Sequence, residues 1–574
     1  MWVFSTAGCR WLGAAGSLAV TAGGWAAGTL PVRGGQGLWH PHGSALTLAG
    51  AILAYLGLTL LLAAWWRYGR LLAAGARDRV LVTLVCWTAP LLLAPPLYSA
   101  DVYSYIAQGA MVLEGHDVYG AGPSVLGPGD LGHDAAASVG GHWTDTPAPY
   151  GPVFLVLAQA VVHLTGGAVV PAVLGMRLLA VAALALIVWA VRGLAGEAGE
   201  GGENPGGARP DGWDRGAGSG AGALWLAALN PLLLIHVVGG MHNDGLMIGL
   251  MLAGVLLAVR DRWVLGSAVI GLAAMVKSPA AVALLFVGIL LARRRGGGAR
   301  NLLRGLVLPG AVAAAVAAGT TLLAGTGFGW LRTQSVAGTI HTALSVTSDL
   351  GLGLGLLVAD DPQPVKAVVQ KLGLLAALVL IALLARRAWQ GRLSPVAALG
   401  LALLALVALS PMVQPWYLLW GTATVAAAGA WRARPARYLA VLCAALTYET
   451  APSGHTPAYG FALAGVALLL GVLWIRRRER AGAEVSAEAV GPVGPGRAVG
   501  LSGSAEAVGP AGSAETVGPA ASAQADGPAG SGRAVGPSTS AEADGPAGSA
   551  EGVRPSACAG SSDPAGRPSG DRPR

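Results

Sequence analysis

Long apolar runs that end at clusters of arginine are the feature that most limits how this chain can fold. Examples are the runs from Ala45 to Trp66 and from Val80 to Leu97. A run of about 20 apolar residues can cross a bilayer as a helix, which satisfies its own backbone hydrogen bonds in lipid. The composition agrees, because 54% of the 574 residues are hydrophobic and only 11% are charged. The sequence therefore predicts an all-α polytopic membrane protein.

The arginine clusters also predict an orientation, because basic loops tend to remain on the cytoplasmic side of a membrane. The first cluster comprises Arg67, Arg70, Arg77 and Arg79. With this cluster inside, the basic segments at 386–387, 432–437 and 476–478 also fall inside. We expect about 12 to 14 transmembrane helices. We interpret the first run, Trp11 to Leu30, as a span and not as a signal peptide, because further spans follow it.

Two stretches lack apolar runs of this kind. Residues 193–220 form a Gly-rich linker with mixed charge, which consistency with the neighbouring spans places in the cytoplasm. Residues 481–574 contain imperfect repeats such as Ser504-Ala-Glu-Ala-Val-Gly-Pro-Ala-Gly and almost no large apolar side chains. Such a composition cannot bury a core. We therefore expect residues 1–480 to form the membrane domain and residues 481–574 to form a disordered cytoplasmic tail.

The large outer loop at residues 98–150 carries the most informative polar residues. Asp101 follows the apolar run that ends at Leu97, so it lies near the membrane edge on the extracytoplasmic side. An ionisable group at this depth costs free energy unless it has a role there. We interpret Asp101 as a catalytic base. The alternative is that Asp101 caps the first turn of an interfacial helix, in which case Glu114 and Asp117 are the reserve acids.

Other polar and aromatic residues are predicted to share the outer face with Asp101. They are Tyr103, Tyr105, His116, Asp117, Tyr119 and Tyr150 in the first loop, His242, Asn243 and Asp244 in one turn, Lys277 at a helix break, and Gln414, Trp416 and Tyr417 in a later turn. A lysine at a helix break inside an apolar region seldom has a purely structural role. For the aromatic residues, a belt at the membrane interface is the alternative interpretation.

Several short motifs, in this order, resemble a known family. They are Tyr98-Ser-Ala-Asp-Val-Tyr-Ser-Tyr105, Gly115-His-Asp-Val-Tyr119, Pro149-Tyr-Gly-Pro152, Asn230-Pro231, His242-Asn-Asp-Gly245, Lys277-Ser-Pro279 and Gln414-Pro-Trp-Tyr417. Together, across about residues 40 to 475, they look like the polyprenol-phosphate-mannose-dependent α-1,6-mannopyranosyltransferases of actinobacteria, which are GT-C class glycosyltransferases. In that class an acidic residue in the first large outer loop acts as general base, and Asp101 matches its position.

The resemblance implies transfer of mannose from polyprenyl phosphate mannose to a mannan or glycolipid acceptor. The product would have an α-1,6 linkage formed with inversion on the extracytoplasmic face of the cell membrane. Lys277, His242 and Asn243 would stabilise the leaving phosphate. Asp244 would orient His242 or bind a sugar hydroxyl, and Tyr150, Trp416 and Tyr417 would contact the apolar face of a pyranose.

Three further expectations concern cofactors, partners and rival functions. We expect no cofactor and no metal requirement, because the sequence has no Asp-x-Asp pair for a divalent ion. The net charge of +8 arises from arginines between spans, so we expect a bilayer and not nucleic acid as the partner. A GT-C enzyme for another sugar or acceptor remains an alternative, as does a lipid or solute transporter.

Overall fold

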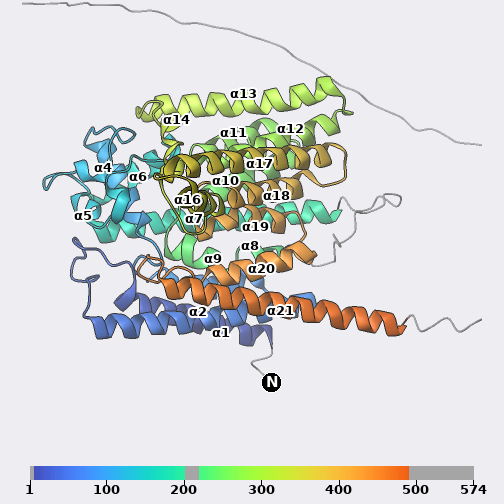
Figure 1. Cartoon of the computed structure of the whole chain (residues 1–574), viewed down its shortest axis with the longest axis horizontal. Helices are drawn as coiled ribbons and strands as arrows, with labels where there is room; N and C mark the ends of the chain where they lie inside the picture. Colours follow the sequence, from blue (N-terminus) through green and yellow to red (C-terminus); the bar gives the residue numbers. More distant parts are fainter. Residues whose placement is uncertain (1–4, 201–218, 490–574) are drawn as a thin grey trace, which may run out of the picture. The chain divides into compact units, whose positions relative to one another are not determined.

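The computed structural model describes residues 5–200 and 219–489 of the chain (Figure 1). Throughout these residues the regular secondary structure is helical and no strand occurs, which confirms the all-α prediction. Most of the predicted linker at 193–220 and of the predicted tail at 481–574 lies outside the described residues. The last described helix, α21 (Ala458–Ala489), extends beyond the predicted start of that tail.

Three N-terminal helices pack against one another: α1 (Thr6–Ala27), α2 (Ser44–Ala73) and α3 (Val80–Leu91). Glycines allow α1 and α2 to approach closely. A Cβ atom added to Gly16 would lie 2.7 Å from the carbonyl oxygen of Gly57, and one added to Gly57 would lie 2.6 Å from that of Gly16. Small residues at such a crossing permit close contact between helix backbones.

The hydrogen bonds of these helices define two ends of the helical layer. At the first, Arg10 lies 2.7 Å from the carboxylate of Asp78, which also accepts a 2.9 Å hydrogen bond from Tyr68. We call this the basic end, because the arginines that follow α2 lie here. At the second, beyond α1, the Thr29 backbone N–H donates to the carbonyl oxygen of Pro96 at 2.9 Å. We call this the loop end.

The apolar run predicted to span the membrane up to Leu97 forms a helix only as far as Leu91. The prolines Pro95 and Pro96 cannot continue the helical hydrogen bonds, so the chain proceeds in an irregular conformation. Arg177 of the next long helix satisfies the freed carbonyl groups. Its guanidinium donates to the backbone oxygens of Leu92, Ala94 and Pro95.

The predicted outer loop is built of short helices, which Figure 1 shows together at the left, beside one end of the long helices. They are α4 (Asp101–Leu113), η2 (Pro123–Val125), α5 (His133–Ala136), η3 (Gly141–Thr144) and α6 (Pro152–Thr165). Helix α4 packs against α6. Asp101 is the first residue of α4, so the irregular segment between α3 and α4 determines where its side chain lies.

The middle of the chain contains two interrupted helices. In order, the elements are α7 (Val169–Glu200), α8 (Ser219–Ala227), α9 (Pro231–Leu233), the π-helix η4 (Leu234–Gly239), α10 (Asp244–Val259), α11 (Trp263–Ala274), η5 (Ser278–Ala281) and α12 (Val282–Arg294). The chain bends by 48° between α8 and the α9–η4 segment. The predicted helix break at Lys277 is confirmed, because Lys277 lies between the end of α11 and the start of η5.

The remaining described helices complete the bundle before α21. They are α13 (Ala299–Ala324), α14 (Trp330–Thr333), α15 (Val336–Thr339), α16 (Val346–Val358), α17 (Gln363–Trp389), α18 (Pro395–Ala408), η6 (Pro415–Tyr417), α19 (Leu418–Ala427) and α20 (Arg434–Leu446).

Five described helices are long and apolar enough to cross a membrane, namely α2, α7, α13, α17 and α21. A sixth span results if α8 and the bent α9–η4 segment are counted as one, and six more apolar helices have only 10–17 residues. Proline, glycine and polar turns divide many predicted runs into such short helices. Helix α1, predicted as the first span, is not among the five, since small residues dominate it. The multi-pass membrane character stands, while the expected 12 to 14 spans stay a prediction.

Candidate active site

A cavity of about 380 Å³ opens beside Asp101 at the loop end. Six residues singled out in the sequence line it: Asp101, Tyr150, Lys277, Gln414, Trp416 and Tyr417. They come from segments far apart in the chain. Cavities with apolar walls and a few convergent polar groups are the usual form of a small-molecule site.

The Asp101 carboxylate contacts two residues beside this cavity. Its Oδ2 lies 3.2 Å from Nδ1 of His242 and accepts a 3.3 Å hydrogen bond from the Tyr105 hydroxyl. The side chain of Asp101 is 27% exposed, whereas that of His242 is fully buried. Asp101 therefore presents its carboxylate to the cavity, and the imidazole lies behind it.

Opposing effects set the protonation of Asp101. Burial alone would raise its pKa, but the adjacent His242, the charge of Lys277 and a hydrogen bond with Ser99 outweigh burial, so the pKa is lowered. The position at the start of α4 adds to this, since a helix N-terminus favours negative charge. The carboxylate is thus ionised near neutral pH, the state that a general base requires.

Two turns with unusual backbone geometry meet beside the Asp101–His242 pair. Tyr98 has a φ of 60° and Met241 a φ of 55°, backbone angles that residues other than glycine seldom adopt. The turns are joined, because the Leu97 backbone N–H donates to the carbonyl oxygen of Gly239 at 3.2 Å. Such strain, together with a π-helical turn in η4, is common at functional sites.

Polar atoms beneath the cavity lack partners. Within the described part of the chain, neither side-chain polar atom of Asn243, neither ring nitrogen of His242 and not the indole nitrogen of Trp416 meets hydrogen-bond geometry. The Trp416 ring stacks on His242 with centroids 3.6 Å apart. Buried polar groups are normally satisfied, so the unpaired atoms of Asn243, Nε2 of His242 and the indole nitrogen of Trp416 are unusual, whereas Nδ1 of His242 has its 3.2 Å contact with Asp101. Trp416 lines the cavity, whereas His242 and Asn243 lie outside its described lining.

A second carboxylate, Asp244, is fully buried and pairs with Lys277. Both of its oxygens lie 2.9 Å from Nζ of Lys277, and Oδ1 also accepts a 2.7 Å hydrogen bond from the Trp420 indole. The described hydrogen bonds of the Asp244 carboxylate thus go to Lys277 and Trp420 and not to His242, and the other predicted role of Asp244, binding a sugar hydroxyl, stays a prediction. Burial would lower the pKa of Lys277, but the Asp244 charge outweighs burial and raises it.

Aromatic rings form much of the cavity wall. Tyr417 stacks on Trp420 with centroids 4.4 Å apart, and Nζ of Lys277 lies 4.4 Å from the Tyr417 ring centroid. Tyr150 and Tyr105 meet edge to face, with centroids 5.4 Å apart. Tyr150, Trp416 and Tyr417, the predicted aromatic platform, all line the cavity, and their contact with a pyranose stays a prediction.

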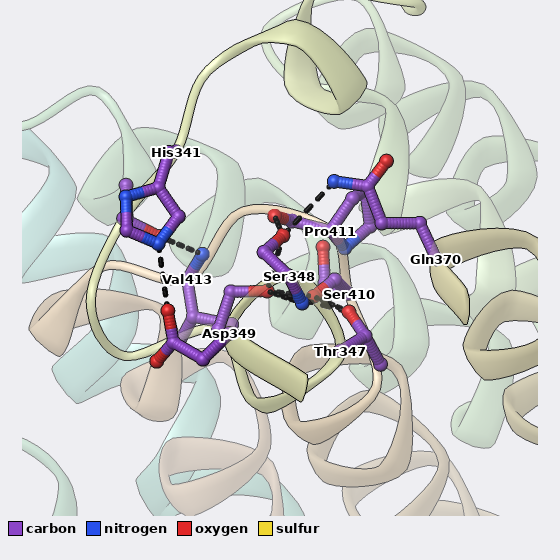
Figure 2. Close-up of polar contacts among 10 residues, drawn as sticks. His341, Thr347, Ser348, Asp349, Gln370, Ser410, Pro411 and Val413 are labelled. Atoms are coloured by element: carbon purple, nitrogen blue, oxygen red, sulfur yellow. Dashed lines mark hydrogen bonds and ion pairs between the residues drawn. The ribbon is translucent and has the colours of Figure 1, made fainter. Parts of the chain in front are cut away.

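A hydrogen-bond network fixes the turn that precedes Gln414, as Figure 2 shows. Ser348 of α16 donates to the carbonyl oxygen of Pro411 at 2.6 Å and accepts a 2.9 Å hydrogen bond from Gln370 of α17. The hydroxyl of Thr347 donates to the Ser410 carbonyl oxygen at 3.1 Å. These side chains of α16 and α17 therefore position one wall of the cavity.

Several predicted site residues do not line the cavity. The Tyr103 hydroxyl donates to the Thr29 carbonyl oxygen at 2.6 Å, and that of Tyr119 donates to the Tyr150 carbonyl oxygen at 3.0 Å. His116 lies 4.0 Å from Asp130.

The two reserve acids have local roles. Asp117 accepts a 3.0 Å hydrogen bond from the Tyr119 backbone N–H, and Glu114 accepts one at 2.9 Å from that of Leu131. Both side chains are exposed. The structure therefore gives neither acid a place at the cavity.

The sequence interpretation missed six polar or aromatic residues of the lining: Trp143, Ser278, Thr333, Gln334, Ser410 and Trp420. Trp420 lies three residues after Tyr417 on a continuing helix, so helical spacing would have placed both on one face. Ser278 directly follows Lys277. Gln334 directly follows α14, and nothing in the local sequence points to it.

Comparisons with known proteins agree on one family. The family model described as alpha-(1→6)-mannopyranosyltransferase, N-terminal domain, matches residues 10–209 and 210–293, and the MptB C-terminal domain model matches residues 341–477. A protein named a probable alpha-(1→6)-mannopyranosyltransferase from Mycolicibacterium smegmatis is 36% identical over 468 residues, which cover 74% of this chain and 79% of the relative.

Two further relatives carry related names. The alpha-(1→6)-mannopyranosyltransferase A of Mycobacterium tuberculosis is 34% identical over 72% of this chain and 79% of its own length. The alpha-(1→6)-mannopyranosyltransferase B of Corynebacterium glutamicum is 29% identical over 73% of this chain and 72% of its own length. The segments matched by the two family models include every lining residue of the cavity between Asp101 and Lys277 and between Ser410 and Trp420.

Proposed function

Because this chain belongs to the alpha-(1→6)-mannopyranosyltransferase family, it is a membrane glycosyltransferase, and we propose that it transfers mannose from polyprenyl phosphate mannose to a mannan or glycolipid acceptor. The new linkage is α-1,6 and forms with inversion on the extracytoplasmic face. The observation that carries the proposal is the ionised Asp101 carboxylate beside a cavity that also contains Lys277 and an aromatic wall.

The lining of the cavity supports a lipid-linked donor. Leu374 of α17 and Leu406 of α18 line it together with Val282 of α12. Helix α17 is one of the candidate membrane spans, with 22% of its most apolar window buried. A sugar phosphate can therefore lie near Lys277 while its isoprenoid chain remains against apolar helices.

The proposed reaction is a single displacement. The acceptor hydroxyl oxygen attacks the anomeric carbon of mannose, the bond from that carbon to the phosphate oxygen breaks, and polyprenyl phosphate leaves. The acceptor proton passes to the carboxylate of Asp101. One base is enough for inversion, whereas retention by double displacement would need a carboxylate nucleophile as well.

Lys277 is suited to the leaving phosphate. Its ammonium group has three N–H donors, and the two oxygens of Asp244 account for two of them. The third can donate to a phosphate oxygen from the cavity wall. The ion pair with Asp244 holds the ammonium group in place before substrate binds, which avoids reorganisation during the reaction.

We propose that the enzyme needs no metal ion, because Lys277 and the indole N–H of Trp416, which both line the cavity, supply stabilisation to a singly linked phosphate. In the described part of the chain, no three His, Cys, Asp or Glu side chains form a potential metal site. Chelator treatment of membranes, followed by an assay of mannosyl transfer, tests this proposal directly.

The proposed function is tested with membranes that contain the wild-type chain, Asp101→Asn or Glu114→Gln at equal levels. Radiolabelled mannose on polyprenyl phosphate is the donor, and a short α-mannoside is the acceptor. We expect Asp101→Asn to lower the rate about 10²- to 10⁴-fold, because removal of a general base has effects of this size. Glu114→Gln is the matched control, because Glu114 is exposed and outside the cavity.

Linkage analysis of the product and a comparison of donors complete the test. A product with α-1,6 linkages supports the proposal. Equal rates for wild type and Asp101→Asn would refute Asp101 as the base. Faster transfer of another lipid-phosphate sugar than of mannose would instead favour the alternative of a different donor.

A further inference from the structure

A second and larger cavity, of about 680 Å³, lies at the basic end of the molecule. Four tryptophans and five arginines dominate its lining: Trp66, Trp225, Trp431 and Trp474 with Arg67, Arg70, Arg432, Arg437 and Arg478. No acidic residue contributes to the described lining. We call it the Trp/Arg cavity. It is built where α2, α8, α20 and α21 meet, so it is separate from the cavity beside Asp101.

The tryptophans are held in fixed positions. Trp65 and Trp225 stack with centroids 4.9 Å apart, and the indole N–H of each donates to the backbone oxygen of the other, at 2.9 and 2.8 Å. Two glycines make room for the rings. A Cβ atom on Gly69 would lie 2.2 Å from the Trp225 ring, and one on Gly222 would lie 1.9 Å from that of Trp431. The aromatic walls are therefore pre-organised.

The arginines bring positive charge to these walls. Arg432 and Arg478 lie over the rings of Trp431 and Trp474, each 4.8 Å from the ring centroid. Arg432 also donates to the carbonyl oxygen of Ala73 at the end of α2. No Asp or Glu among residues 5–198 and 220–480, the ranges whose acidic side chains the structure describes, forms an ion pair with Arg70, Arg432, Arg437 or Arg478. The cavity thus has several guanidinium groups whose charge is not neutralised there.

We propose that the Trp/Arg cavity binds a membrane phospholipid with an anionic phosphate headgroup. The phosphate lies among the arginines, which suit phosphate because a guanidinium can donate two parallel hydrogen bonds to it. The acyl chains follow the apolar surfaces of α2 and α21. This inference is independent of the proposed reaction.

Access from the bilayer distinguishes a lipid from a soluble phosphate compound. Helices α2 and α21 are both candidate spans, and only 11% of the most apolar window of α21 is buried. A cavity between two such helices is reached sideways from lipid. Basic pockets between membrane helices are known to attract anionic headgroups, and tryptophan favours the interface. The arginine pattern predicts that this end faces the cytoplasm, so the lipid belongs to the inner leaflet.

The test uses the purified full-length chain in detergent and measures lipid binding by native mass spectrometry and by the shift in Tm. Phosphatidylglycerol, phosphatidylcholine and inorganic phosphate are the three probes. We expect wild type to bind phosphatidylglycerol at least about 10-fold more tightly than phosphatidylcholine, with little effect of phosphate. The double variant Arg437→Gln/Arg478→Gln should lose this preference, whereas Arg437→Lys/Arg478→Lys should retain part of it.

Arg476→Gln/Arg477→Gln is the matched control, because both residues are exposed on α21 and lie outside the cavity lining. It removes the same charge and should keep the preference. Equal binding of both lipids by wild type, an equal loss in the control, or full competition by inorganic phosphate would each overturn the proposal.

If the Gln variants do not fold, photocrosslinking decides with the wild type alone. A photoreactive phosphatidylglycerol should label peptides from α2 and α21 around the cavity. Labelling spread evenly over the other membrane helices would overturn the proposal.

Discussion

The carboxylate of Asp101 is held between burial, which favours its neutral form, and the neighbouring His242, which favours its charge. Because Asp101 and His242 lie 3.2 Å apart, the pH below which the proposed base becomes protonated depends on both residues. Tyr105 adds a neutral hydrogen bond to the same oxygen. If an uncharged residue replaced His242, the effect of burial on the Asp101 carboxylate would be less strongly offset, and the pKa of Asp101 would rise.

We predict that His242→Gln moves the acid limb of the pH profile to higher pH. The pKa of Asp101 is lowered chiefly by His242, so its loss raises this pKa and leaves less ionised base at mildly acidic pH. The measurement is kcat/KM against pH for mannosyl transfer. His116→Gln is the control, because His116 is outside the cavity. An acid limb that does not move in His242→Gln would contradict the assignment.

The pair of Asp244 and Lys277 combines a structural and a proposed catalytic role. Asp244→Asn leaves the Lys277 ammonium group without its counter-ion, and we expect a loss of about 3 kcal/mol in stability, at the low end for a buried pair because Lys277 is 15% exposed. The double variant Asp244→Asn/Lys277→Gln should regain most of this stability without regaining activity. Thermal unfolding and the transfer assay measure the two effects. Recovery of both together would argue against a role for Lys277 in transfer.

At the scale of elements, breaks in helices place the functional groups. The end of α3, the π-helical turn in η4 and the break between α11 and η5 bring Asp101, His242 and Lys277 to one region. Each break follows from local chemistry: prolines after α3, the Asn230–Pro231 pair after α8, and Pro279 after Lys277. Asn230 caps the short α9, since its side chain accepts a hydrogen bond from the Leu232 backbone N–H.

The crossing of α1 and α2 gives a prediction about stability. Gly57→Ala should destabilise the protein by about 1–2 kcal/mol, because its Cβ would lie 2.6 Å from a backbone oxygen of α1 and the strain exceeds the gain in helix propensity. Gly319→Ala in α13 is the matched control, because its Cβ would meet nothing within 4 Å. We expect this control to be neutral or slightly more stable by thermal unfolding. A lower Tm for Gly319→Ala than for Gly57→Ala would contradict this account.

At the scale of the whole molecule, the two ends of the helical layer have different chemistry. The loop end contains an acidic base, a buried ion pair and aromatic rings around a cavity of about 380 Å³. The basic end contains the Trp/Arg cavity of about 680 Å³ without a lining carboxylate. This asymmetry underlies the two proposals, a lipid-linked sugar donor at the loop end and an anionic lipid at the basic end.

The sequence alone determined the class of protein and the region of the site. Apolar runs and arginine clusters indicate membrane helices because the length of an apolar run and the charge at its ends can be read from one short stretch of sequence. The order of short motifs was enough to identify the family, and Asp101, Lys277, Gln414, Trp416 and Tyr417 were predicted at positions that do line one cavity. These residues stand at element ends, where proline, glycine and charged residues give a visible local signal.

Only the tertiary structure decided which side chains are partners. No local feature of the sequence shows that Asp244 pairs with Lys277 and not with the nearby His242. The exposed positions of Glu114 and Asp117 likewise depend on how the loop folds. The Trp/Arg cavity joins residues from α2, α8, α20 and α21, far apart in sequence. Helix packing fixes such contacts through the crossing and rotation of whole helices, which no local pattern of residues encodes.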